Sequence, residues 1–203
     1  GQSLQAKSKA KKLLFVTGTR ADFGKLEPLA LAAQNEGFEI SFFITGMHMM
    51  SRYGETRLEV KRFVGAEFFE FVNQREGDAL EFILSKTILG FSDFVHEHRP
   101  DLVLIHGDRV EALAASIVCA MRYIPSAHIE GGEVSGTIDE SIRHCNTKLC
   151  AAHFVSSEGA KQRVLALGFA LIVWGYGQAR LNPVALWTPW VGGRPTYAPP
   201  TST

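Results

Sequence analysis

The chain has 203 residues, 46% of them hydrophobic, and its 21 Lys and Arg balance 21 Asp and Glu to a formal net charge of zero. This composition is typical of an ordinary globular protein and argues against a nucleic-acid or membrane partner held by bulk charge. No apolar run approaches the roughly 20 residues that span a bilayer, and an odd count of three cysteines favours reduced thiols, so we expect a cytoplasmic protein.

Apolar runs alternate with helical patterns along most of the chain. Strands are predicted at 12–18, 38–46, 66–72, 100–107, 124–131 and 152–157. Helices are predicted at 23–36, 52–63, 76–98, 109–122, 140–150 and 158–167. Strands that are apolar throughout and alternate with helices indicate a parallel sheet covered on both faces. The expected fold is a Rossmann-like, doubly wound α/β domain over residues 13–168, preceded by a disordered basic tail at 1–12.

The last segment, residues 169–203, differs in composition from the rest. It contains no Asp, Glu or Lys, but it holds all three tryptophans and five of the eight prolines. Its apolar residues follow neither the two-residue period of a strand nor the 3.6-residue period of a helix for long. Two interpretations stay open at this point: a Pro-rich terminal wrap on the domain surface, or a segment that is not native to this fold.

Polar and charged residues gather where four of the predicted strands end. The loops are GTRADFGK (18–25), TGMH (45–48), HGDR (106–109) and HIEGGEVSGTIDESIRH (128–144). In open parallel sheets, ligands bind outside the carboxyl ends of the strands, where the strand order reverses. We therefore expect these loops to converge on one rim and to form the binding site.

The first loop is a glycine turn that runs into a predicted helix. Free backbone N–H groups at a helix start suit a phosphate, and Arg20 and Lys25 add mobile positive charge. The structural alternative is a capped helix with Asp22 as its N-cap. Both interpretations can hold together.

The third loop places Asp108 and Arg109 at a strand end. Asp108 could cap the following helix, or it could be a catalytic carboxylate that faces the crevice. Arg109 could hold a phosphate, or it could simply pair with Asp108. Spacing alone leaves both choices open.

The fourth loop concentrates titratable groups. His128 and Glu130 share one strand face, and the paired glycines that follow let the backbone approach a ligand closely. Asp139 and Glu140 lie at a predicted helix start, where the helix dipole favours their ionised forms. Neighbouring acids push one pKa up, so one site can hold an acid and a base. The lesser alternative is a metal site made of His128, Glu130, Glu133 and His144. Because their spacing matches no common ligand motif, we expect no metal.

These motifs together carry a specific resemblance. TGTRADFGKLEPL, TGMH, HGDRVEALAAS and HIEGGEVSGTIDESIRH resemble the hydrolysing UDP-N-acetylglucosamine 2-epimerases of sialic-acid biosynthesis, over roughly residues 13–168. The related non-hydrolysing epimerases share the GTR and HGD turns but not this form of the fourth loop. The resemblance implies a GT-B architecture, in which two Rossmann-like domains hold the nucleotide sugar between them. It also implies conversion of UDP-GlcNAc and water into N-acetylmannosamine and UDP.

The resemblance implies roles for individual residues. The positions of the family's catalytic carboxylates match Asp108, Glu130 and Asp139. Arg20 and Arg109 match positions near the diphosphate. The full set of expected substrate-binding residues is Arg20, Gly24, Lys25, His48, Arg109, His128 and Glu140. No metal or redox cofactor is required, and the expected partners are the nucleotide sugar and a second copy of the chain.

The sequence also departs from the family. The resemblance stops near Gly168, and we expect no second domain of this family in residues 169–203, which favours the interpretation of that segment as non-native. Cys145 and Asn146 replace small and aliphatic residues in their helix. Half of a two-domain cleft loses much of the binding energy for catalysis, so we expect little or no activity from the isolated chain. The alternatives are a non-catalytic nucleotide-sugar-binding remnant and half of a GT-B glycosyltransferase.

Overall fold

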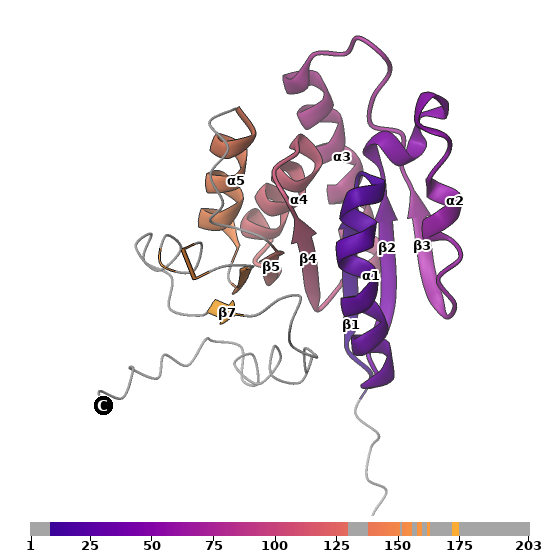
Figure 1. The fold of residues 1–203 in the computed structure, drawn as a ribbon, viewed down its shortest axis with the longest axis vertical. Coiled ribbons are helices and arrows are strands. Elements are labelled where there is room, and N and C mark those ends of the chain that lie inside the picture. Colours follow the sequence, from indigo (N-terminus) through magenta and orange to yellow (C-terminus); the bar gives the residue numbers. More distant parts are fainter. Residues whose placement is uncertain are drawn as a thin grey trace, which may run out of the picture.

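The computed structural model describes residues 9–129, 138–150, 152–155, 158–159, 162 and 172–174. Its centre is a sheet of seven parallel strands in the order β3-β2-β1-β4-β5-β6-β7 (Figure 1). The strands are β1 (Lys12–Thr17), β2 (Glu39–Ile44), β3 (Ala66–Glu70), β4 (Leu102–His106), β5 (Ser126–Ile129), β6 (Ala152–Val155) and β7 (Ile172–Trp174). The predicted Rossmann-like, doubly wound fold is confirmed.

Helices cover both faces of the sheet (Figure 1). The helical elements are α1 (Arg20–Asn35), the short turns η1 (Gly46–Met49) and η2 (Ser51–Tyr53), α2 (Arg57–Val60), α3 (Leu80–His98), α4 (Val110–Met121) and α5 (Ile138–Leu149). One core joins α1 and α2 to the first face, with Phe15, Leu26 and Phe42 fully buried. A second core joins α3 and α4 to the other face, with Leu14, Phe43 and Phe91 fully buried. The strands are apolar throughout because both of their faces are covered.

The strand order fixes where a ligand can bind. It runs outward in one direction from β1 and in the other from β4, so it reverses between these two strands. The carboxyl end of β1 leads through Gly18 and Thr19 into α1, and the end of β4 leads through 107–109 into α4. Open α/β sheets bind ligands between two such turns, and we call this position the crevice.

Three predicted helices need correction. Helix α3 begins at Leu80 instead of residue 76, with Ala79 as its N-cap. Helix α1 begins at Arg20 instead of residue 23, because Thr19 supplies the N-cap. No continuous helix spans 52–63: η2 ends at Tyr53, its C-cap Gly54 has a left-handed φ of 79°, and α2 has only four residues. A left-handed glycine stops a helix because the next peptide turns away from the helix axis.

The sheet also continues into the segment of unusual composition. Strand β7 lies within 169–203 and pairs in parallel with β6, with Phe154 opposite Val173. The division at residue 168 stays a prediction. Within the described part of the chain, no helix combines the length and apolarity that crossing a bilayer would need.

Candidate functional site

Asp22 links the two turns that flank the crevice. Its Oδ2 accepts hydrogen bonds from the backbone N–H groups of Gly18 at 3.1 Å and Thr19 at 2.9 Å. Its Oδ1 lies 2.8 Å from Nδ1 of His106, at the end of β4. Thr19 is the N-cap, and its hydroxyl accepts from the backbone N–H of Asp22 in a capping box. The prediction of Asp22 as the N-cap is therefore wrong. Asp22 is instead the third residue of the helix, and its carboxylate accepts the backbone N–H of the N-cap, Thr19.

His48 lies beneath the turn after β2. It has no exposed surface, and its Nε2 and Nδ1 each lie 2.8 Å from a threonine hydroxyl, of Thr17 and Thr56 respectively. Burial lowers the pKa of His48, because an apolar surrounding disfavours the charged imidazole. In this structure His48 therefore supports the rim from below and does not form its surface.

The turns after β1 and β2 approach each other closely. A Cβ at Gly46, whose φ is 63°, would lie 2.7 Å from the carbonyl oxygen of Gly18 and 2.8 Å from Oε1 of Glu111. The N–H of Gly46 donates to Oδ1 of Asn73 at 3.1 Å, and Nδ2 of Asn73 donates to Oε1 of Glu111 at 3.2 Å. Glycine is required at position 46 by both its backbone angle and its neighbours. Asn73 and Glu111 thus hold the turns together.

The turn after β4 is held by the next strand and by α5. The carbonyl of Gly107 accepts from Nε2 of His128 at 2.8 Å and from Nδ2 of Asn146 at 3.3 Å. Burial lowers the pKa of His128 to about 4 and that of the neighbouring His153 to about 3. A neutral His128 at this place fixes the HGD turn, with no exposed surface of its own.

Asp108 and Arg109 have different partners, so the interpretation that Arg109 simply pairs with Asp108 is wrong. Asp108 forms a hydrogen-bonded ion pair with Arg143 of α5 and not with Arg109. Arg109 is the N-cap residue of α4, where no side chain caps the helix. Its Nε lies 3.7 Å from Oε2 of Glu111. A carboxylate and a guanidinium therefore stand side by side at the carboxyl end of β4.

Three more expected binding residues lie at the start of α1. Arg20 has 75% of its side chain exposed and pairs with Glu59 at 3.2 Å. Lys25 is exposed. Gly24 is exposed too, and a Cβ there would meet nothing within 4 Å. The cations of this helix start therefore face solvent beside the crevice.

The fourth loop lies mostly outside the described residues. Glu130 and Glu133 fall in the range 130–137, and nothing is described of the side chains of Asp139, Glu140 and His144. The backbone of α5 begins at Ile138, which confirms that Asp139 and Glu140 occupy a helix start. Asp139 stands one turn before Arg143 and so shares its helix face.

Sequence reasoning missed three residues that build this rim: Asn73, Glu111 and Arg143. Asn73 follows the end of β3, whereas the predicted site was built from the loops after β1, β2, β4 and β5. Glu111 is the only charged residue of α4, a signal that could have found it. Arg143 lies inside the motif of the fourth loop, but nothing in the spacing links it to Asp108.

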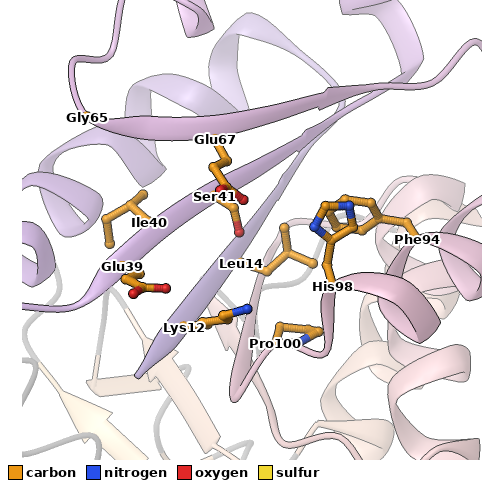
Figure 2. A pocket seen from close by; sticks show the side chains of 10 residues that line it. All are labelled: Lys12, Leu14, Glu39, Ile40, Ser41, Gly65, Glu67, Phe94, His98 and Pro100. Atoms are coloured by element: carbon orange, nitrogen blue, oxygen red, sulfur yellow. The ribbon is translucent and has the colours of Figure 1, made fainter. Parts of the chain in front are cut away.

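A separate pocket of about 210 Å³ lies at the other end of the strands (Figure 2). Its lining includes Lys12, Glu39 and Glu67, from the three strands β1, β2 and β3, and the stacked rings of Phe94 and His98. It lies at the amino ends of the strands, opposite the crevice, and its charges are mixed. The candidate site is therefore the rim at the carboxyl ends.

Comparison with known proteins gives a consistent result. The family described as UDP-N-acetylglucosamine 2-epimerase matches residues 30–180. A UDP-N-acetylglucosamine 2-epimerase of Neisseria meningitidis serogroup B is 46% identical over 159 residues, which are 78% of this chain and 42% of that protein. A hydrolyzing UDP-N,N'-diacetylbacillosamine 2-epimerase of Legionella pneumophila is 39% identical over 163 residues, 78% of this chain and 43% of that protein.

Solved structures agree with these sequence relatives. The crystal structure of a Neisseria meningitidis UDP-GlcNAc 2-epimerase bound to UDP-GlcNAc aligns with a TM-score of 0.70 and 25% identity, covering 80% of this chain and 46% of that one. The structural neighbours are GT-B-like, and this chain corresponds to their N-terminal part. The chain thus spans less than half the length of the relatives it matches.

Proposed function

Since the chain belongs to the UDP-N-acetylglucosamine 2-epimerase family, we propose that it is the N-terminal half of the active site of a hydrolysing epimerase. The whole enzyme converts UDP-GlcNAc and water into N-acetylmannosamine and UDP. The C2 proton and UDP leave to form a glycal. Water then supplies a hydroxyl to C1 and a proton to the opposite face of C2.

The observation that carries the proposal is the ion pair between Asp108 and Arg143. It ties the middle of α5 to the end of β4 at the switch in strand order. Asp139 shares the helix face of Arg143, so two of the three proposed catalytic carboxylates belong to elements that meet there. Glu130 follows directly after β5, the strand beside β4.

Each part of the reaction has candidate residues on this rim. Removing the C2 proton needs a base, and returning a proton from the other side needs an acid, which we assign to Asp108, Glu130 and Asp139 as a group. The leaving UDP gathers negative charge, which Arg20, Lys25 and Arg109 would stabilise. We assign Gly24 and Glu140 to the ligand surface. The buried His48 and His128 act by holding the turns in place.

The hydrolysing form of the reaction rests on the fourth loop and on the printed names of relatives such as the Legionella enzyme. Identification of the product of an assay in D₂O tests it, because only hydrolysis releases the free sugar, while deuterium at C2 marks a proton delivered from solvent. We expect any product to be free N-acetylmannosamine with one deuterium at C2. UDP-N-acetylmannosamine as the product would show a non-hydrolysing enzyme instead, and glycosylated acceptor would show a transferase.

For these 203 residues on their own, which span 42% of the Neisseria enzyme, we propose a second candidate function, nucleotide-sugar binding without turnover. We expect calorimetry to detect binding of UDP and of UDP-GlcNAc, while release of UDP from UDP-GlcNAc stays near background. Arg20→Ala and Arg109→Ala should each weaken UDP binding about tenfold, the effect of losing one charge-assisted hydrogen bond. Steady UDP release that Glu130→Gln abolishes would overturn the expectation of inactivity. A chain that binds neither compound would overturn the proposed function.

A further inference from the structure

We propose that Glu111 is a positioning residue of this site: its buried carboxylate holds Nε of Arg109 so that the remaining donors of the guanidinium face an anionic ligand. The inference rests on the proposed function, because the ligand in question is the diphosphate of a nucleotide sugar. Arg109 makes the contact with the ligand, and Glu111 acts through it.

Glu111 is a carboxylate in an unusual place. Only 2% of its surface is exposed, and it lies against the turns after β1 and β2. Its Oε1 accepts from Nδ2 of Asn73 at 3.2 Å. Its Oε2 is buried and has no hydrogen-bond partner among the described residues. Nε of Arg109, 3.7 Å away, is the cationic group with which this oxygen pairs.

A purely structural role would use only one of the two oxygens. Asn73 accepts from the N–H of Gly46 and donates to Thr87 and to Oε1 of Glu111. A glutamine at 111 would accept the bond from Asn73 equally well, and a neutral amide is much less costly to bury than a carboxylate. The bond with Asn73 therefore accounts for the position of Oε1. It does not account for the burial of a charged group or for the position of Oε2.

The guanidinium of Arg109 has a buried donor that faces the buried Oε2 of Glu111. Its Nε is buried and, within the described part of the chain, forms no hydrogen bond. The side chain as a whole is 38% exposed, so its exposed surface lies away from Nε. A separation of 3.7 Å is slightly long for a hydrogen bond. A small movement of the guanidinium closes it to a charge-assisted bond and leaves the four Nη hydrogens for a ligand.

The negative charge of Glu111 and its proposed positioning of Arg109 predict opposite changes in UDP affinity when Glu111 is replaced by Gln. This difference gives a test on the intact 203-residue chain. Glu111→Gln removes a negative charge beside the site, so electrostatics alone would tighten the binding of UDP. If Glu111 positions Arg109, the same variant binds UDP about tenfold more weakly by calorimetry, the loss of one charge-assisted bond. In an Arg109→Ala background, Glu111→Gln should cause no further loss, because the group that it orients is gone.

Glu59→Gln is the matched control. It also removes the carboxylate partner of an arginine near the rim, but the pair of Glu59 with Arg20 is largely exposed. We expect its affinity for UDP to stay within twofold of wild type, because exposed ion pairs contribute little. Binding by Glu111→Gln that equals or exceeds wild type would overturn the positioning role while leaving the proposed function intact.

A second measurement needs no ligand. In nuclear magnetic resonance spectra, the Nε–H of Arg109, assigned by its loss in Arg109→Lys, should exchange slowly with water. The resonance should broaden or vanish in Glu111→Gln and persist in Glu111→Asp, which keeps the charge. A wild-type Nε–H that exchanges rapidly would contradict the pairing. If the resonance behaves as expected but wild type binds no UDP, the pairing holds and the proposed function fails.

Discussion

Nδ1 of His106 lies 2.8 Å from Oδ1 of Asp22, although the two residues are 84 positions apart in the chain. The contact joins the end of β4 to the start of α1, the two sides of the crevice where the strand order reverses. The other oxygen of the carboxylate holds the backbone of the turn after β1. One residue therefore sets the spacing of the crevice and the start of the helix beside it.

Replacing Asp22 should be costly. Asp22→Ala removes the acceptor for the N–H groups of Gly18 and Thr19 and leaves His106 without this partner. Losing a capping side chain costs about 1 kcal/mol, and leaving buried donors unpaired costs about 1–3 kcal/mol. We expect the free energy of unfolding, measured by urea denaturation, to fall by about 2–4 kcal/mol.

Asp78→Ala is the matched control for Asp22→Ala. The carboxylate of Asp78 also accepts a backbone N–H, that of Arg75 at 2.8 Å, but in an exposed turn. Water replaces the lost acceptor there, so we expect a change below about 1 kcal/mol. Equal losses in the two variants would show that the contact across the crevice contributes nothing to stability.

Two helical glycines should respond in opposite directions to alanine. A Cβ at Gly90 of α3 would lie 2.2 Å from the ring of Phe71, so Gly90→Ala must displace an aromatic ring and should destabilise by about 1–3 kcal/mol. A Cβ at Gly24 of α1 meets nothing within 4 Å, so Gly24→Ala should stabilise by about 0.5–1 kcal/mol through higher helix propensity. Thermal unfolding of both variants measures the difference.

Gly24→Ala also tests the assignment of Gly24 to the ligand surface. A methyl group at a position where a ligand approaches the backbone should weaken UDP binding while the protein becomes more stable. If the affinity for UDP stays unchanged, Gly24 has no part in the site. If stability falls instead, α1 is strained in a way that the free space around Gly24 does not show.

Buried histidines should make the protein sensitive to acid. Burial lowers the pKa of His128 from its ordinary value of 6.5 to about 4. Between these two values the unfolded chain binds a proton that the folded chain does not, so the free energy of unfolding falls as pH falls from 6.5 to 4. For His128 alone the fall is about 3 kcal/mol.

To test this, the free energy of unfolding of wild type and of His128→Gln is measured by urea denaturation at pH 7.5 and at pH 5. We expect wild type to lose more stability than the variant between the two pH values, because the variant has no proton to gain at 128. His153, whose pKa burial lowers to about 3, should act in the same direction. Parallel losses in wild type and His128→Gln would contradict a neutral, buried imidazole.

The three cysteines should differ in reactivity. Cys145 is exposed, whereas Cys119 and Cys150 are buried, and burial raises the pKa of Cys150 to about 11 and raises that of Cys119 further. Because the thiolate is the reactive form, we expect a thiol reagent to modify one cysteine in the native protein and three in urea. Cys145→Ser should remove the native reaction. Rapid modification of two or three thiols in the native state would contradict the packing around Ser116 and Cys150.

The positions of strands and of the rim followed from the sequence because they depend on local patterns. Apolar runs ending in glycine marked the strands, and polar loops such as 106–109 followed them. The loop HGDR after the fourth predicted strand then placed Asp108 and Arg109 at the end of β4. Local signals were sufficient because, in a parallel sheet, the carboxyl ends of neighbouring strands meet at one edge.

The partners of those residues could not be predicted, because they depend on contacts between distant parts of the chain. Asp108 pairs with Arg143 and Arg109 with Glu111, although Asp108 and Arg109 are adjacent. Asn146 stands where the family has small or aliphatic residues, and its amide donates to the carbonyl of Gly107. Such pairings appear only when the helices are placed against the sheet.

The two threonine contacts of His48 form a chain of hydrogen bonds beneath the rim, and all of its bonds donate in one direction. Thr17 has one hydroxyl hydrogen, which it donates to the carbonyl of Thr19 at 3.3 Å, so its oxygen accepts from Nε2 of His48. Because burial lowers the pKa of His48, the ring is neutral and carries its single N–H at Nε2. Nδ1 then accepts from the hydroxyl of Thr56. Three dipoles in series point the same way, toward the residue that caps α1, and a ligand at that turn meets a polarised row of bonds beneath it.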